Sequence, residues 1–176
     1  MTRRIGAVRT SRSFEKAKAE VEALARGESL PSFHHKKRQH LEDDEQRGLF
    51  FWVNRMALTD QRYKAIFATP NGGTRNPKEA ARMKGQGVKA GVSDIFVAVP
   101  AWISGLVEKH GLWIEMKRPL VPKGRKPETS PEQIEWMERM QRNGYIACLC
   151  YGKDQAQEAI TAYLAGREVP HQWEPK

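Results

Sequence analysis

The sequence predicts an α/β fold in which helices flank a small mixed β-sheet. Apolar residues recur at helical spacing in some segments and gather in short β-branched and aromatic runs in others. From residue 41 onwards these segments follow the order α, β, α, β, β, α, β, α, with one βα-type crossover. Such alternation is typical of a sheet sandwiched between helices. Because the chain has 176 residues, we expect one domain with an extension.

Local signals support each expected element. The helix expected over 42–58 has an apolar stripe that includes Leu49 and Val53, and acidic residues fill its first turn. The helix expected over 130–142 begins with Ser130 as N-cap and Pro131 in its first turn. The remaining elements are helices over 77–86 and 154–164 and strands over 63–69, 94–99, 112–117 and 145–151.

The first 40 residues are expected to form a basic extension that is partly helical or disordered. A helix is predicted over 14–25, and 33–40 is interpreted as a basic linker whose three histidines do not form a metal site. Residues 41–166 are expected to form the folded domain, and 167–176 a C-terminal tail.

The chain is strongly basic, with a formal net charge of +9 and a pI of about 9.7. Residues 1–40 hold ten Lys and Arg against four Glu, whereas the rest of the chain holds twenty against seventeen Asp and Glu. This balance indicates a polyanionic partner, most commonly a nucleic acid. A basic tail that serves only solubility is the alternative.

The sequence predicts neither a membrane span nor a signal peptide. No apolar run approaches the roughly 20 residues needed to cross a bilayer. Cys148 and Cys150 lie two residues apart in an expected strand, where a disulfide loop has no room. We therefore expect the two cysteines to be core thiols of a protein in the reducing cytoplasm. We expect no nucleotide cofactor.

Three charged residues in the middle of the chain predict chemistry. Glu115 and Lys117 project to the same face of an otherwise apolar strand, and burial of such charges is costly unless they are paired or bind a metal. Asp94 begins its strand whereas Glu115 is near the end of its own, so an antiparallel pairing would bring them together. Two carboxylates on adjacent strands suit Mg²⁺ or Mn²⁺. The alternative is a Glu115–Lys117 ion pair on a half-exposed strand.

An ordered set of motifs surrounds these residues. The segments are 70–75 (PNGGTR), 79–84 (EAARMK), 87–94 (GVKAGVSD), 113–117 (WIEMK) and 130–136 (SPEQIEW). The series resembles the VRR-NUC (virus-type replication-repair nuclease) family of the PD-(D/E)XK superfamily, in its compact stand-alone form. The resemblance extends over about residues 43–166 and implies a restriction-endonuclease-like αβββαβ core.

The resemblance also implies roles for individual residues. Asp94, Glu115, Glu45 and the Met116 backbone carbonyl would hold Mg²⁺, for which Mn²⁺ can substitute. Lys117 would be the catalytic lysine and Gln133 the glutamine that the family adds to the site, so that the catalytic set is Glu45, Asp94, Glu115, Lys117 and Gln133. The position of Glu45 stays open, because Asp44 and Gln46 adjoin it and because an acidic helix N-terminus is an equal explanation.

Two groups of polar and basic residues adjoin the catalytic strands and are expected to bind phosphates. They are Asn71, Arg75, Lys78, Arg82, Lys84 and Lys89 before Asp94, and Arg118, Lys123, Arg125 and Lys126 after Lys117. The family resemblance implies a homodimeric endonuclease acting on branched DNA, such as a Holliday junction, in replication, recombination or repair. A restriction-like or end-processing nuclease and a non-catalytic DNA-binding protein are the alternatives.

Overall fold

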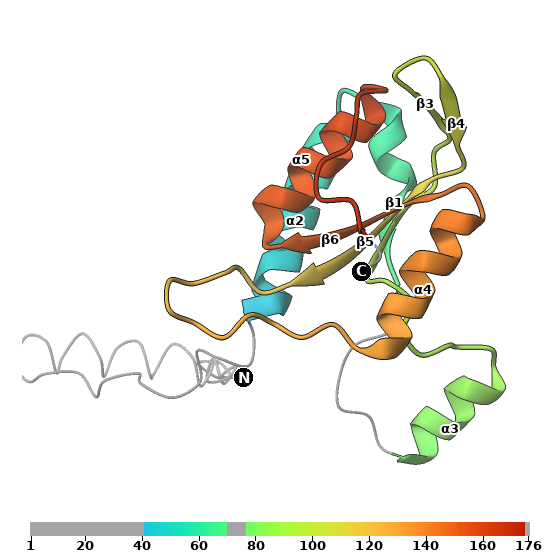
Figure 1. Ribbon diagram of the computed structural model, residues 1–176, viewed down its shortest axis with the longest axis vertical. Helices are drawn as coiled ribbons and strands as arrows, with labels where there is room; N and C mark the ends of the chain where they lie inside the picture. The colour runs from blue at the N-terminus through green and yellow to red at the C-terminus, as the bar shows by residue number, and fades with distance from the viewer. Residues whose placement is uncertain (1–40, 70–76, 175–176) are drawn as a thin grey trace, which may run out of the picture. The chain divides into compact units, whose positions relative to one another are not determined.

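The computed structural model describes residues 41–69 and 77–174, which lie within the unit formed by residues 38–176 (Figure 1). The predicted helix over 14–25 and the linker over 33–40 lie outside the described residues. The helices are α2 (Leu41–Met56), η1 (Gln61–Ala65, a 3-10 helix), α3 (Pro77–Gly85), α4 (Pro131–Arg142) and α5 (Lys153–Leu164). The strands are β1 (Ile66–Ala68), β2 (Ile95–Val97), β3 (Ala101–Ile103), β4 (Val107–Lys109), β5 (Leu112–Lys117) and β6 (Ile146–Tyr151).

Four of the strands form a mixed sheet in the order β1-β2-β5-β6. Strand β2 is antiparallel to both of its neighbours, whereas β5 and β6 are parallel. Helix α4 lies between β5 and β6 in the chain and forms the crossover that a parallel pair requires. The predicted α/β class and the αβββαβ core are therefore confirmed, together with the two further predicted helices, α3 between β1 and β2 and α5 after β6.

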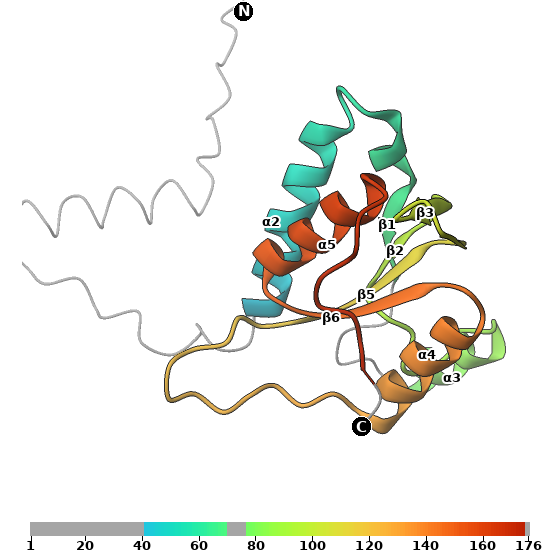
Figure 2. The same cartoon turned by 45° about the horizontal axis from the view of Figure 1, so that its top comes forward.

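Helices cover both faces of this sheet (Figure 2). On one face, buried residues of α2 and α5 such as Leu49 and Ile160 pack with Ile114 and Met116 of β5. Helix α4 contacts β5 and β6 on the opposite face, where Trp136 packs edge-to-face on Trp113. Because strand side chains alternate, the α4 face of β5 also carries Glu115 and Lys117. No helix in the described ranges is long and apolar enough to cross a membrane.

The strand expected over 63–69 is shorter than predicted. Residues 61–65 instead form η1, because Asp60 caps it by accepting a hydrogen bond from the Arg62 backbone N–H at 3.0 Å. The apolar Tyr63 side chain is buried there against Trp52, with ring centroids 5.4 Å apart. The Asp60 cap thus outweighs the β-favouring composition of residues 63–69.

A hairpin that was not predicted joins β2 to β5. Strands β3 and β4 pair as a separate two-stranded sheet, with Ile103 opposite Val107. Between them, Ser104 and Gly105 both have positive φ, of 52° and 67°. The Ser-Gly pair between two short apolar runs is the signal that would have predicted it.

The residues after α5 pack against the domain. The Leu149 N–H donates to the His171 carbonyl at 3.1 Å, and the Trp173 N–H donates to the Ala147 carbonyl at 2.8 Å. Val169 is buried in the main core. The segment we expected as a tail therefore covers the outer edge of β6, an edge that would otherwise expose unpaired backbone groups. As predicted, Cys148 and Cys150 are free, buried core thiols.

Gly91 allows the turn before β2 to pack closely against the start of α4. Its φ is +78°, and a Cβ built there would lie 2.3 Å from the Glu132 carbonyl oxygen. We expect Gly91→Ala to lower the free energy of unfolding by roughly 2–4 kcal/mol, from backbone strain and steric overlap together. Gly87 is a matched control, because its φ is +92° but no atom lies within 4 Å of a Cβ. Urea denaturation should give Gly87→Ala a smaller loss, of about 1–2 kcal/mol; equal losses would contradict this account.

Candidate active site

Asp94 and Glu115 are brought together by the register of β2 and β5. Ile95 lies opposite Ile114, so the next position places Asp94 opposite Glu115. The Met116 N–H donates to Asp94 Oδ2 at 2.9 Å. The backbone before β2 is held in turn by Thr69, whose N–H donates to the Asp94 carbonyl at 2.8 Å. The offset pairing expected from the sequence is present.

Glu115, Lys117 and Gln133 form a closed hydrogen-bonded network. Lys117 Nζ donates to Glu115 Oε1 at 2.8 Å and to Gln133 Oε1 at 3.0 Å, and the Gln133 amide nitrogen donates to Glu115 Oε1. Glu115 is 1% exposed and Lys117 is 7% exposed. This burial excludes the alternative of an ion pair on a half-exposed strand.

The start of α4 holds Gln133 in this network. Ser130 and Gln133 form a capping box, in which the Gln133 N–H donates to Ser130 Oγ at 3.3 Å and the Ser130 N–H donates to Gln133 Oε1 at 2.9 Å. One side chain therefore both begins the helix and positions Lys117. The sequence predicted the cap and proposed a site role for Gln133, but only the fold joins the two.

Burial makes the two carboxylates difficult to ionise. The pKa of Glu115 is raised from an ordinary 4.5 to about 7, chiefly by burial and then by the neighbouring Asp94 charge, against the opposing effect of Lys117. Burial also raises the pKa of Asp94, although the Met116 N–H and Lys117 act in the other direction. Both groups would be stabilised as anions by a nearby cation.

The donor set fits a magnesium ion. Glu115 Oε2 is buried and has no hydrogen-bond partner among the described residues, and such an oxygen is costly to leave unpaired. Within the same residues no three His, Cys, Asp or Glu side chains form a complete metal cage. Mg²⁺ commonly uses one or two protein carboxylates, and takes its remaining ligands from water and substrate phosphates. Asp94 and Glu115 meet that requirement.

Glu42, in the acidic first turn of α2, contributes to the surroundings of these carboxylates. The Arg118 N–H donates to Glu42 Oε1 at 3.2 Å, and the charge of Glu42 raises the pKa of both Asp94 and Glu115. Glu45 Oε2 instead accepts from the Lys153 N–H at 2.7 Å, at the start of α5. Glu42 was not among the predicted site residues, although it lies one helical turn before Glu45 on the same face.

The expected phosphate-binding residues are distributed over two segments. Arg82 and Lys84 are exposed on the last turn of α3, and Lys89 is exposed in the loop that follows. Asn71, Arg75 and the side chain of Lys78 lie outside the described part of the chain. In the segment after β5, Lys123, Arg125 and Lys126 are exposed and Arg118 is half-buried, and Arg125 forms an ion pair with Glu128.

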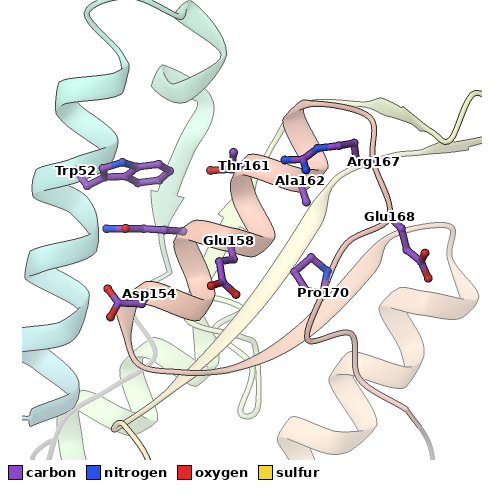
Figure 3. Close-up of a pocket in the computed structure, with 9 residues that line it drawn as sticks. Trp52, Asp154, Glu158, Thr161, Ala162, Arg167, Glu168 and Pro170 are labelled. Atoms are coloured by element: carbon purple, nitrogen blue, oxygen red, sulfur yellow. The ribbon is translucent and has the colours of Figure 1, made fainter.

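A separate shallow hollow of about 710 Å³ lies between α2, α5 and the C-terminal segment (Figure 3). Asp154, Glu158 and Glu168 line it together with Arg167, and Trp52 lies at its α2 side. Three carboxylates against one guanidinium disfavour a phosphate ligand. The charge of this hollow therefore disfavours a nucleic acid.

The raised pKa values predict the pH dependence of metal-free stability. Between about pH 4.5 and pH 7 the folded protein binds more protons at Glu115 than the unfolded chain does, so stability should fall as the pH rises through this window. The loss should be on the order of 3 kcal/mol. Thermal unfolding in EDTA across this range should show the slope, and Glu115→Gln should flatten it, leaving the contribution of Asp94. An unchanged slope in that variant would contradict the assignment.

The comparisons with known proteins agree with this arrangement. No protein-family model and no curated protein matches the sequence. A solved structure described as a VRR_NUC domain protein is similar over 76% of this chain and 97% of its own, with 26% sequence identity and a TM-score of 0.57. The sheet order, the paired carboxylates beside a buried lysine, and this similarity together support the resemblance to the VRR-NUC family.

Proposed function

We propose that the protein is a Mg²⁺-dependent endonuclease that hydrolyses phosphodiester bonds of branched DNA. One observation carries the proposal above all: the buried Lys117 is held by Glu115 and Gln133, and the second oxygen of Glu115 has no donor among the described residues. In a purely structural buried ion pair, both carboxylate oxygens are normally hydrogen-bonded. A non-catalytic DNA-binding protein would gain nothing from carboxylates placed where phosphates bind.

Each residue of the site has a separate role in the proposed reaction. Asp94, Glu115 and the Met116 carbonyl would hold the ion, which when bound supplies a Lewis acid for the phosphoryl oxygen and lowers the pKa of a water ligand. Lys117 donates toward the reacting phosphate and stabilises the negative charge that develops in the transition state. Gln133 keeps the Lys117 ammonium in place, so that little reorganisation accompanies the reaction.

We assign the helix carboxylate of the site to Glu42 in preference to Glu45. Glu42 accepts from the residue that follows Lys117, whereas Glu45 is occupied at the N-terminus of α5. That helix has no side-chain cap of its own, since its N-cap residue is Gly152. Glu45 therefore supplies the negative charge that a helix N-terminus favours.

Branched DNA and a homodimer are part of the proposal. The cations on α3 and in the segment after β5 lie on either side of the catalytic strands in the chain and suit two stretches of phosphates. Paired cuts on two strands need two active sites, and a second copy of the chain would supply the other. A restriction-like or end-processing nuclease would use the same residues on linear duplex or on DNA ends.

Substitution of the central residues tests the chemistry. With junction, flap, linear duplex and single-stranded DNA in Mg²⁺, the unsubstituted protein should cut branched DNA preferentially, and EDTA should stop the reaction. Asp94→Ala and Lys117→Ala should each lower the cleavage rate by roughly a hundredfold or more, because each removes transition-state stabilisation. DNA binding should survive, since the outer cations remain. Cleavage at the unsubstituted rate by either variant would refute the site assignment.

The pair Glu42→Gln and Glu45→Gln tests the helix carboxylate. Each change removes one charge from the first turns of α2 and keeps a hydrogen-bond acceptor. Glu42→Gln should raise the Mg²⁺ concentration for half-maximal cleavage by about tenfold or more. Glu45→Gln should leave it unchanged and lower the melting temperature, because α5 loses a favourable charge at its N-terminus. The reverse pattern would return the role to Glu45.

A further inference from the structure

Two exposed apolar side chains lie within the basic segment that follows the catalytic strand. Leu120 and Val121 are 54% and 51% exposed, only three and four residues after Lys117. Arg118 precedes them, and Lys123 follows. Isolated apolar residues on a surface need no explanation, but an adjacent pair between cations at an active site does.

A hydrogen-bonded turn follows Leu120 and begins at Val121. The Gly124 N–H donates to the Val121 carbonyl at 3.0 Å, with Pro122 and Lys123 at the centre of the turn. Lys123 has a φ of 58°, a conformation that favours glycine. A Cβ at Gly124 would lie 2.2 Å from Val121 Cγ2, so the turn packs closely on the valine. Backbone of this kind, kept at a non-glycine residue, is typical of ligand-binding segments.

Both ends of the segment are held beside Lys117. At the start, the Arg118 N–H donates to Glu42. At the other end, Lys126 Nζ lies 5.1 Å from the centre of the Tyr151 ring, and Tyr151 is opposite Lys117 in the β5–β6 pairing. Since three to four residues span at most about 10 to 14 Å and a DNA strand advances about 3.4 Å per nucleotide, the pair lies within about four nucleotides of the phosphate at Lys117.

A second exposed Leu-Val pair provides a comparison. Leu106 and Val107 are 79% and 50% exposed in the β3–β4 hairpin. This hairpin follows the end of β2 opposite to Asp94, and Glu108 comes next in the chain. The same side chains therefore occur once beside cations at the active-site end and once away from it.

We propose that Leu120 and Val121 form a wedge that enters the base stack of DNA next to the scissile phosphate. The proposal rests on the proposed nuclease function and names how that site selects its substrate. Cations on either side of the pair contact phosphates, and between two phosphates of one strand the apolar surface available is the faces of the bases. Insertion between bases is easiest where stacking is already interrupted, so a wedge favours branch points over continuous duplex.

The test compares Leu120→Ser/Val121→Ser with Leu106→Ser/Val107→Ser in the full chain. The DNA probes are a four-way junction, a flap, the fully paired duplex of the same sequence and its single strand, with 2-aminopurine at positions flanking the branch point and at the same sequence positions in the unbranched probes. Fluorescence is measured in a Lys117→Ala background, where the DNA stays intact. Melting temperatures of both double variants should stay within a few degrees of the parent, because the changed side chains are exposed.

We expect 2-aminopurine fluorescence to rise when the parent protein binds branched DNA, and Leu120→Ser/Val121→Ser to remove this rise. The same variant should lower kcat/KM on branched DNA by about tenfold or more and change single-strand cleavage little. The hairpin variant should match its parent in both measurements. An unchanged fluorescence rise, or an equal loss on single strands, would overturn the wedge. Conversion of a dimer to a monomer by the loop variant would overturn it in favour of a protein contact.

This design separates the two proposals. If the unsubstituted protein with Mg²⁺ cuts none of the probes, the nuclease proposal fails. The fluorescence measurement then still decides whether the loop opens the base stack.

Discussion

The buried carboxylate of Glu115 is the group on which the described active site depends. A negative charge with 1% exposure is tolerated in a sheet only when donors or cations surround it, and here Lys117 and Gln133 supply the donors on one oxygen. Gln133 can do so because Ser130 begins α4 at that point, and α4 approaches closely because Gly91 has no side chain. The burial of the Glu115 charge thus depends on the helix cap that holds Gln133, and the position of that cap depends on the absence of a side chain at Gly91.

Burial of two neighbouring carboxylates lowers the stability of the protein when no cation is bound beside them. Burial raises the pKa of both Asp94 and Glu115, so the site favours any ligand that supplies positive charge. The rest of the domain is built to tolerate that cost. Sheet residues such as Ile114 pack between α2 and α5, and the segment after α5 covers the edge of β6. A rigid sheet with both faces covered holds the two carboxylates at a fixed separation.

The two ends of the sheet have different surroundings. At the active-site end, the β2–β5 register, the first turn of α2 and the start of α4 converge, and the basic segment after β5 leaves from there. The other end carries the β3–β4 hairpin, and the Tyr163 hydroxyl donates to the Val99 and Lys109 carbonyls beside it. The exposed Leu-Val pairs at these two ends therefore face different chemical environments, which is why only Leu120 and Val121 are assigned to DNA.

The α/β class, the order of the core elements and the residues of the central motif could be predicted from the sequence, because periodicity, caps and motif order are local properties. The neighbourhood of Asp94 and Glu115 could be predicted too, since strand ends and alternation constrain the register. The different partners of Glu42 and Glu45 could not, because the two residues share a helix face and differ only in what the rest of the fold brings to each. The fold also lets Gln133 cap α4 and contact Lys117 at the same time. The segment after α5 has no periodicity and is ordered by its pairing with β6. These contacts join residues far apart in the chain, and no local pattern encodes them.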